Sequence, residues 1–229
     1  RLNSDGSEDT SFDIGSGKCC ITTTSFDFDL QGEKIIYGSA FTQYNGVNVN
    51  KLIRLNPDAS IDASFNIGAG PNGAVSLIKV LDNNEIIVDG FFTQFDVVNN
   101  GDNRMVKLSE NGTVIPSFSQ KAILPLYYGF AEQFGNRVFI GTLNSIILLN
   151  LDGAVSSTMT IPGVTLHTIN NVAIASKDSA FLLGSFSVNN MEDRWHILKL
   201  SFSRKPVITK VNAPTTLPED SLFSVSKEQ

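Results

Sequence analysis

The stretch RLNSDGSEDTSFDIG at residues 1–15 returns almost intact as RLNPDASIDASFNIG at residues 54–68. A third copy begins with KLSENGT at Lys107 and ends in Ser117-Phe118, so the first two steps, from 1 to 54 and from 54 to 107, are equal. Weaker copies begin near Leu149 and Leu198. Self-similarity at a fixed period is the sequence signature of a repeat architecture. The chain is therefore expected to repeat one supersecondary unit.

A second block recurs between these copies. IIYGSAFTQYN at residues 35–45 matches IIVDGFFTQFD at residues 86–96, and weaker copies are VFIG at 138–141 and FLLGSFS at 181–187. Two independent blocks that recur in the same order leave little room for chance. The repeat therefore covers most of the chain.

Each unit reads as four short strands. In the second unit the expected strands are Ala74–Val80, Glu85–Phe91, Arg104–Leu108 and Val114–Phe118. Turn signals separate them at residues 82–84, 99–102 and 110–112, and Asn-Gly between apolar runs is a strong hairpin signal. No window shows the apolar spacing of an amphipathic helix. The unit is therefore expected to be a four-stranded antiparallel meander.

The second strands are apolar on successive residues, at 86–88, 138–140 and 181–183. A strand with one wet face alternates, whereas an unbroken apolar run indicates that both sheet faces are covered. Blades stacked around an axis have that environment, and a two-sheet sandwich does not. The predicted fold class is all-β, a β-propeller or partial propeller, with a sandwich or a β-solenoid as alternatives.

The strand count predicts about four and a half units. Propeller repeats are expected over residues 1–205, and residues 206–229 hold the last strand and a C-terminal linker or tail. Because half a blade would leave an open sheet edge, we expect a ring of five or more blades in a longer chain. The expected sections are a half-unit at 1–14 and units near 20–67, 74–119, 123–161 and 165–211.

The recurring Asp-Gly turn has a structural explanation. An aspartate side chain can bond the backbone N–H two residues on, while glycine takes the positive φ. The aromatic residues that follow at a fixed distance are expected to plug the space between blades. The turn residues are Asp5, Gly6, Asp58, Asn111, Gly112, Asp152 and Gly153, and the plug residues are Phe12, Phe65, Phe118 and Met159.

The pattern at residues 1–12, followed by FTQYNG at residues 41–46, resembles the delta-60 repeat of bacterial and phage-associated proteins. The first two units match closely, and residues 107–202 match only in outline. The resemblance implies a propeller-like architecture and an extracellular, cell-surface or virion setting. It implies no catalytic residues.

Composition excludes some functions. The net charge of −6 argues against nucleic acid as a partner, and no apolar run approaches the ~18 residues of a membrane span. His167 and His196 have no third group at catalytic spacing, and the carboxylate pairs Asp5/Asp9 and Asp58/Asp62 recur with the repeat as turn residues would. We therefore expect no enzyme.

No metal site or cofactor is expected either. The adjacent Cys19 and Cys20 cannot staple distant segments, and a zinc site would need further Cys or His at set spacing. They are expected to be reduced thiols.

Aromatic residues beside loops are the candidate binding residues, because their rings can stack on sugars. They are Tyr44, Phe95, Tyr127 and Tyr128, with inter-blade packing as the alternative role. The expected function is a non-catalytic interaction module for protein or glycan attachment within a larger extracellular, adhesive or phage-particle protein. The alternatives are a structural building block or docking body of a virion, bound to neighbouring subunits, and a glycoside hydrolase.

Overall fold

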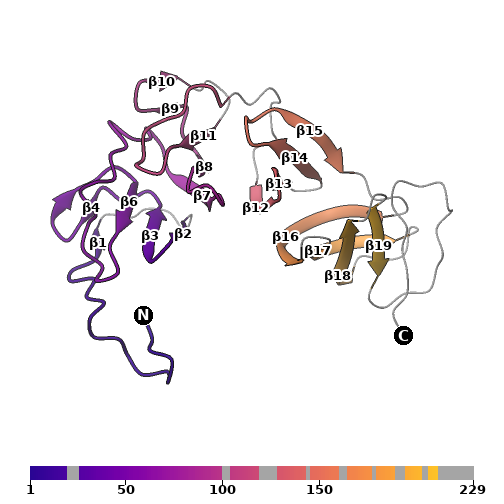
Figure 1. The fold of residues 1–229 in the computed structure, drawn as a ribbon, viewed down its shortest axis with the longest axis horizontal. Coiled ribbons are helices and arrows are strands. Elements are labelled where there is room, and N and C mark those ends of the chain that lie inside the picture. Colours follow the sequence, from indigo (N-terminus) through magenta and orange to yellow (C-terminus); the bar gives the residue numbers. More distant parts are fainter. Residues whose placement is uncertain are drawn as a thin grey trace. The chain divides into compact units, whose positions relative to one another are not determined.

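All regular elements of the computed structural model are β-strands (Figure 1). It describes residues 1–19, 26–99, 104–118, 128–142, 145–159, 164–176, 179–188, 194–202 and 206–210. The chain divides into two compact units, unit 1 at Arg1–Phe118 and unit 2 at Ser119–Gln229. A helix able to cross a membrane is not found in the described part of the chain.

Unit 1 contains two three-stranded antiparallel sheets, which we call blade 1 and blade 2. The strand order is β2-β3-β6 in blade 1 and β7-β8-β11 in blade 2. A fourth segment adds a single bridge to each blade, Leu55 to Ile61 and Leu108 to Val114. The strands are β2 (Asp27–Gln31), β3 (Lys34–Gly38), β6 (Leu52–Leu55), β7 (Val75–Val80), β8 (Ile86–Gly90) and β11 (Met105–Leu108).

A small hairpin is inserted before the third strand of each of these blades. In blade 1 the hairpin β4–β5 also pairs with β1, and in blade 2 the equivalent hairpin β9–β10 is bridged by Pro71. The turn Asn45-Gly46 has positive φ at both residues, as in the tight turns that suit hairpin twist. The strands are β1 (Lys18–Cys19), β4 (Gln43–Tyr44), β5 (Val47–Asn48), β9 (Gln94–Phe95) and β10 (Val98–Asn99).

Unit 2 contains two four-stranded meanders, blade 3 and blade 4. Every strand pairs antiparallel with the next one along the chain. Blade 3 comprises β12 (Tyr128–Phe134), β13 (Arg137–Thr142), β14 (Ile146–Asn150) and β15 (Val155–Met159). Blade 4 comprises β16 (Val164–Ser176), β17 (Ser179–Val188), β18 (Arg194–Phe202) and β19 (Pro206–Lys210).

The middle strands are covered on both faces. Every residue of β6, β8 and β11 is buried, so these strands show no alternation of buried and exposed positions. In unit 1 one core cluster joins Ile36 and Leu52 of blade 1 to Ile78 and Ile86 of blade 2. The two blades therefore pack face to face. The expectation from unbroken apolar runs is confirmed at residues 86–88 and 138–140, which are all buried, but it is wrong at residues 181–183, where burial alternates and Leu183 is 39% exposed.

Two aspartates tie the first strands of these blades together. Asp27 Oδ2 accepts the N–H of Ile78 at 2.7 Å, and Asp29 Oδ2 accepts the N–H of Val80 at 2.8 Å. Their Oδ1 atoms accept the N–H groups of Phe28 and Leu30 at 2.9 and 2.8 Å. Each carboxylate thus bridges β2 and β7. Burial raises the pKa of Asp27, because it disfavours the charged form.

Candidate interaction site

Arg54 is the centre of a buried polar network in unit 1. Its Nε donates to Asp62 Oδ2 at 2.7 Å, and its Nη2 donates to Ser64 Oγ at 3.1 Å. Its Nη1 donates at 2.6 Å both to Gln31 Oε1 and to the carbonyl oxygen of Glu110 in the next repeat. Only 4% of Arg54 is exposed. The guanidinium therefore fixes the turn of one repeat to the turn of the next.

The same contacts recur one repeat earlier. Arg1 pairs with Asp9, and its Nη1 donates to the carbonyl oxygen of Pro57 at 2.9 Å. The cation also lies over an aromatic ring in three copies: Arg1 over Phe12 at 5.7 Å, Arg54 over Phe65 at 4.8 Å and Lys107 over Phe118 at 5.5 Å. We call this arrangement the repeat clasp. The equal spacing of the cation and the phenylalanine in the three copies is therefore explained by the contact between them.

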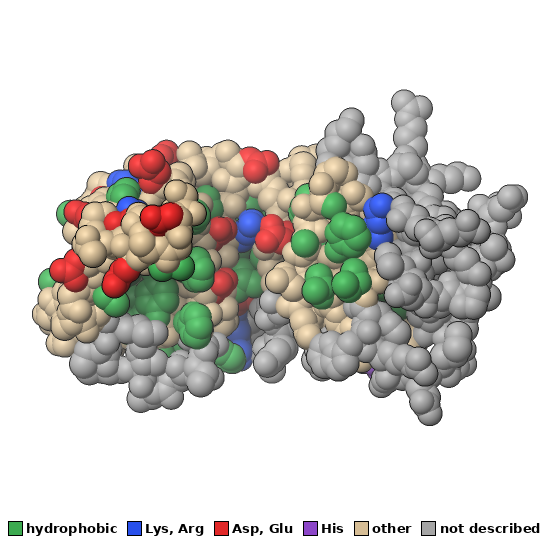
Figure 2. All heavy atoms as spheres, turned by 90° about the horizontal axis from the view of Figure 1, so that it is seen from below, with side chains coloured by type: hydrophobic (Ala, Val, Ile, Leu, Met, Phe, Trp, Pro, Cys, Tyr) green, Lys and Arg blue, Asp and Glu red, His purple; other side chains and the backbone are tan. Residues whose placement is uncertain are grey.

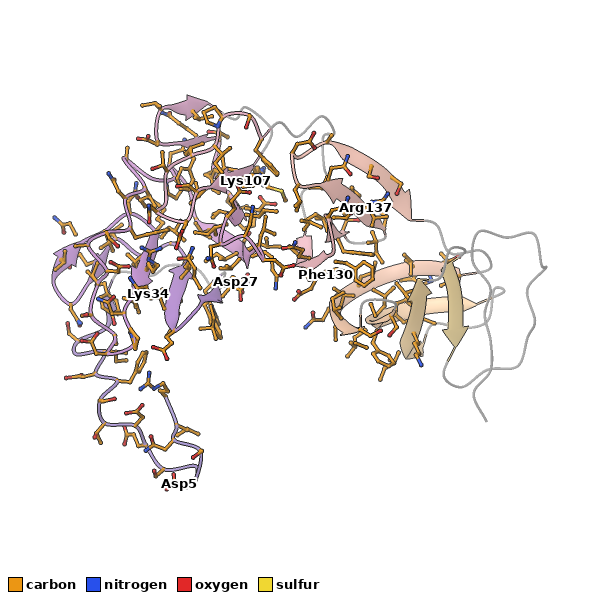
Figure 3. The ribbon with its side chains drawn as sticks, viewed as in Figure 1. Asp5, Asp27, Lys34, Lys107, Phe130 and Arg137 are labelled. Carbon is orange, nitrogen blue, oxygen red and sulfur yellow. The ribbon has the colours of Figure 1, made fainter. Side chains whose placement is uncertain are left out.

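Asp62 is the anion of the central clasp. Burial alone would raise its pKa, but hydrogen bonds from Lys34, Ser64 and Arg54 hold the pKa well below its usual range. Lys34 Nζ lies 2.6 Å from Asp62 Oδ2, and Lys34 is at the start of β3 (Figure 3). Asp62 therefore stays ionised, and its oxygens are engaged by the clasp.

The turn residues of the repeats form Asx turns. Asp5 Oδ1 accepts the N–H of Ser7 at 2.9 Å, Asp58 Oδ1 accepts that of Ser60 at 3.0 Å, and Asp152 Oδ1 accepts that of Ala154 at 3.0 Å. Three glycines have φ near +90°, at 84° for Gly6, 91° for Gly112 and 87° for Gly153. The second copy has Ala59 at this place, with φ 69°. Asn111 contributes through its backbone, whose carbonyl oxygen accepts the N–H of Asn66 at 2.8 Å.

The predicted plugs lie against the core at its margin. Phe65 is partly buried and packs on the cluster shared by blades 1 and 2. Phe12 and Phe118 are also partly buried. The side chain of Met159 lies outside the described residues.

Two of the predicted binding residues are buried and not available as exposed contacts. Tyr44 is 4% exposed and its hydroxyl donates to the carbonyl oxygen of Ala59 at 2.9 Å. Phe95 is 0% exposed and packs edge-on against Phe92. The expectation that Tyr44 and Phe95 bind a ligand through exposed rings is therefore corrected, because both rings are packed inside unit 1. Tyr127 and the side chain of Tyr128 lie outside the described residues.

A pocket of about 410 Å³ opens beside the hairpin β4–β5. Its lining includes Asn48 and Asn50 from the hairpin and the segment after it, and Phe65 and Asn66 from the turn of the repeat. Arg54 and Asp62 also line it, so the repeat clasp borders the pocket. This volume is in the range of small-ligand sites. The rigid ion pair, the amide groups and one aromatic ring make it the strongest candidate site in unit 1.

One buried carboxylate is not explained by the repeat. Asp89 occupies the place of Gly38, Gly141 and Gly184 in the other blades, and it is only 1% exposed. Its Oδ1 accepts the N–H of Gly90, while its Oδ2 has no hydrogen-bond partner among the described residues. Burial raises the pKa of Asp89 to about 7, against opposing effects of that hydrogen bond and of the charge of Arg104.

The sequence did not reveal the clasp or the pocket. Arg54 and Asp62 are visible in the repeat, but nothing local shows that Arg54 bonds Glu110, 56 residues away. The Asn-Gly pair at residues 45–46 between Tyr44 and Val47 is a hairpin signal that could have located the pocket wall. Asp89 could have been found as the exception among equivalent glycines.

The remaining polar groups give little additional chemistry. Among the described residues, no group of three or more His, Cys, Asp or Glu side chains gathers in one place. His167 Nε2 lies 2.9 Å from Ser187 Oγ within blade 4. Cys20 and the side chains of Cys19 and His196 lie outside the described residues.

Comparison with known families agrees with this geometry. Residues 34–65 and 81–118, which lie in blades 1 and 2 with their turns, match the family described as a domain of unknown function (DUF5122) beta-propeller. A search of curated proteins found no match. Together with the all-strand structure and the antiparallel sheets, the similarity to this family supports the fold of a partial β-propeller.

Proposed function

We propose that the chain is a non-catalytic interaction module that holds a glycan in the pocket beside the hairpin β4–β5. The pocket carries the proposal, because amide groups, an ion pair and an aromatic edge are the groups that recognise sugar hydroxyls and sugar rings. The clasp supports binding without reorganisation, since Arg54 and Asp62 are already fixed by each other. The extracellular, cell-surface or virion setting rests on the delta-60 resemblance.

The carboxylate pairs support a binding role over glycoside hydrolysis. A glycosidase needs two carboxyl groups on either side of one bond. Asp58 is engaged in an Asx turn, and Asp62 is engaged by two cations and Ser64. Both carboxylates therefore have a structural role in the turn of the repeat, which favours binding over hydrolysis.

A glycan array tests the proposal. The chain should retain a subset of glycans, and Asn48→Trp should abolish retention by filling the pocket from an exposed position. Val47→Trp is the matched control, because Val47 is the other residue of β5, is exposed like Asn48 and does not line the pocket. Retention of no glycan, equal loss in both variants, or turnover of chromogenic glycosides would reject the proposal.

A docking body within an assembly is the second candidate. One observation favours it, the apolar side chains exposed on the first strand of blade 1. A protein partner on that surface would make the chain a component of a larger assembly. An assembly of copies would appear in sedimentation velocity as a concentration-dependent oligomer.

A further inference from the structure

The first strand of blade 1 has an exposed apolar face. Phe28 is 59% exposed and Leu30 is 55% exposed, with Phe26 at 56% beside them. We call these three residues the β2 stripe. Figure 2 shows hydrophobic side chains exposed among acidic ones on the N-terminal half. An apolar face of this kind on a sheet indicates a partner.

The equivalent face of blade 2 is covered. Phe28 pairs with Tyr37 as Ile78 pairs with Val88, so Phe28 and Ile78 are equivalent positions. Ile78 is only 4% exposed, and its core cluster includes Ile36 and Leu52 of blade 1. The face that buries β7 is therefore the face of a preceding blade. The β2 stripe is the face of blade 1 that corresponds to this covered face of β7.

The outer end of a preceding repeat is already in position. Arg1 donates to the carbonyl oxygen of Pro57 as Arg54 donates to that of Glu110, and both arginines stack over a phenylalanine. Arg1 therefore joins residues 1–14 to the turn of blade 1 as Arg54 joins its own segment to the turn of blade 2. By analogy with blades 1 and 2, the inner strands of that same repeat are the segment that would cover the β2 stripe.

We propose that the β2 stripe is the docking face for one further blade of this repeat, the blade whose outer segment is residues 1–14. The occupant presents branched aliphatic side chains at the places of Ile36 and Leu52, as blade 1 does to blade 2. Blade 1 supplies Asp27 and Asp29 as acceptors for the N–H groups of Ile78 and Val80 in blade 2. The occupant need not supply such acceptors to blade 1, because the same two aspartates already accept the N–H groups of Phe28 and Leu30. This inference is independent of the pocket, and it excludes a second copy or another protein as the occupant of the same stripe.

Cysteine labelling tests the proposal. Phe28→Cys is placed in a chain whose Cys19 and Cys20 are serine, and a second chain carries a copy of residues 20–53, also without cysteine, ahead of Arg1. That junction restores the natural Ile53-Arg sequence. Maleimide should label Phe28→Cys readily in the first chain and roughly tenfold more slowly in the second. Val47→Cys, at a site with a similar exposure of 53%, should react equally in both.

Two outcomes overturn the proposal. One is an unchanged labelling rate at Phe28→Cys in the lengthened chain. The other is protection in the original chain that disappears on dilution, which would make a second copy the occupant. Leu30→Cys repeats the measurement at the other end of the stripe, so that a local disturbance by one cysteine does not decide the result.

Discussion

At the scale of single residues, Asp89 breaks the repeat in the core. The equivalent positions are glycine, and at two of them the adjacent space is filled, by Val75 beside Gly38 and by Phe130 beside Gly141; a Cβ on Gly38 would lie 2.5 Å from Val75 Cγ1. Blade 2 instead holds a carboxyl whose Oδ2 has no described partner. An unpartnered buried polar atom lowers stability, because it gave up water without replacing it.

The raised pKa of Asp89, about 7, makes this cost pH-dependent. Folding favours the protonated carboxyl of Asp89. The stability that this protonation contributes is complete below the unfolded pKa of about 4, and it is lost as pH rises through the folded pKa of about 7. Asp89→Asn, which cannot ionise, should gain on the order of 1–3 kcal/mol relative to the native chain between these limits. Urea unfolding at several pH values checks this, and parallel stability curves would contradict it.

Gly38 allows blades 1 and 2 to approach. Gly38→Ala should lower the free energy of unfolding by about 1–3 kcal/mol, because the methyl group overpacks the interface at Val75. Gly32→Ala is the control: its φ is 63° but no atom lies within 4 Å of its Cβ position, so it should lose only about 1 kcal/mol. A double-mutant cycle of Gly38→Ala with Val75→Ala should show that the two losses of unfolding free energy are coupled, and additive losses would argue against the contact.

At the scale of elements, the clasp decides how each blade ends. Arg54→Ala should cost about 3–5 kcal/mol in urea unfolding, since it leaves Asp62 buried with only part of its compensating charge. Arg1→Ala should cost less than about 1 kcal/mol, because 44% of the Arg1 side chain is exposed. Equal losses in the two variants would mean that burial does not set the strength of the clasp.

The sequence predicted the strands of blade 2 but not the turn that contains the clasp. In blade 2, β7, β8 and β11 lie within one residue of their expected ends. The strand expected at Val114–Phe118 is reduced to the Val114 bridge, because the segment turns at once and Phe118 N–H donates to Ile115 O at 3.1 Å. Apolar patterning reports burial, which is local. Apolar patterning does not predict the turn or the long-range contact of its arginine.

At the scale of the whole molecule, the blades are joined in pairs, blades 1 and 2 within unit 1 and blades 3 and 4 within unit 2. The described apolar clusters each lie in one unit: one joins blades 1 and 2, and another joins β12–β14 of blade 3 to blade 4. Proteins built this way have stabilities that are sums of repeat terms and nearest-neighbour terms. A defect is therefore expected to spread to the blade that shares its apolar cluster and to fade beyond that pair.

Hydrogen exchange on a pair of core variants tests this. Ile78→Ala and Leu148→Ala each remove a buried side chain, 4% and 7% exposed, and each should cost about 2–5 kcal/mol. Ile78→Ala should accelerate exchange in β2–β11 and leave β12–β18 nearly unchanged, and Leu148→Ala should do the reverse. Loss of protection across both units in either variant would show that the chain unfolds as one cooperative block, with coupling that extends past neighbouring blades.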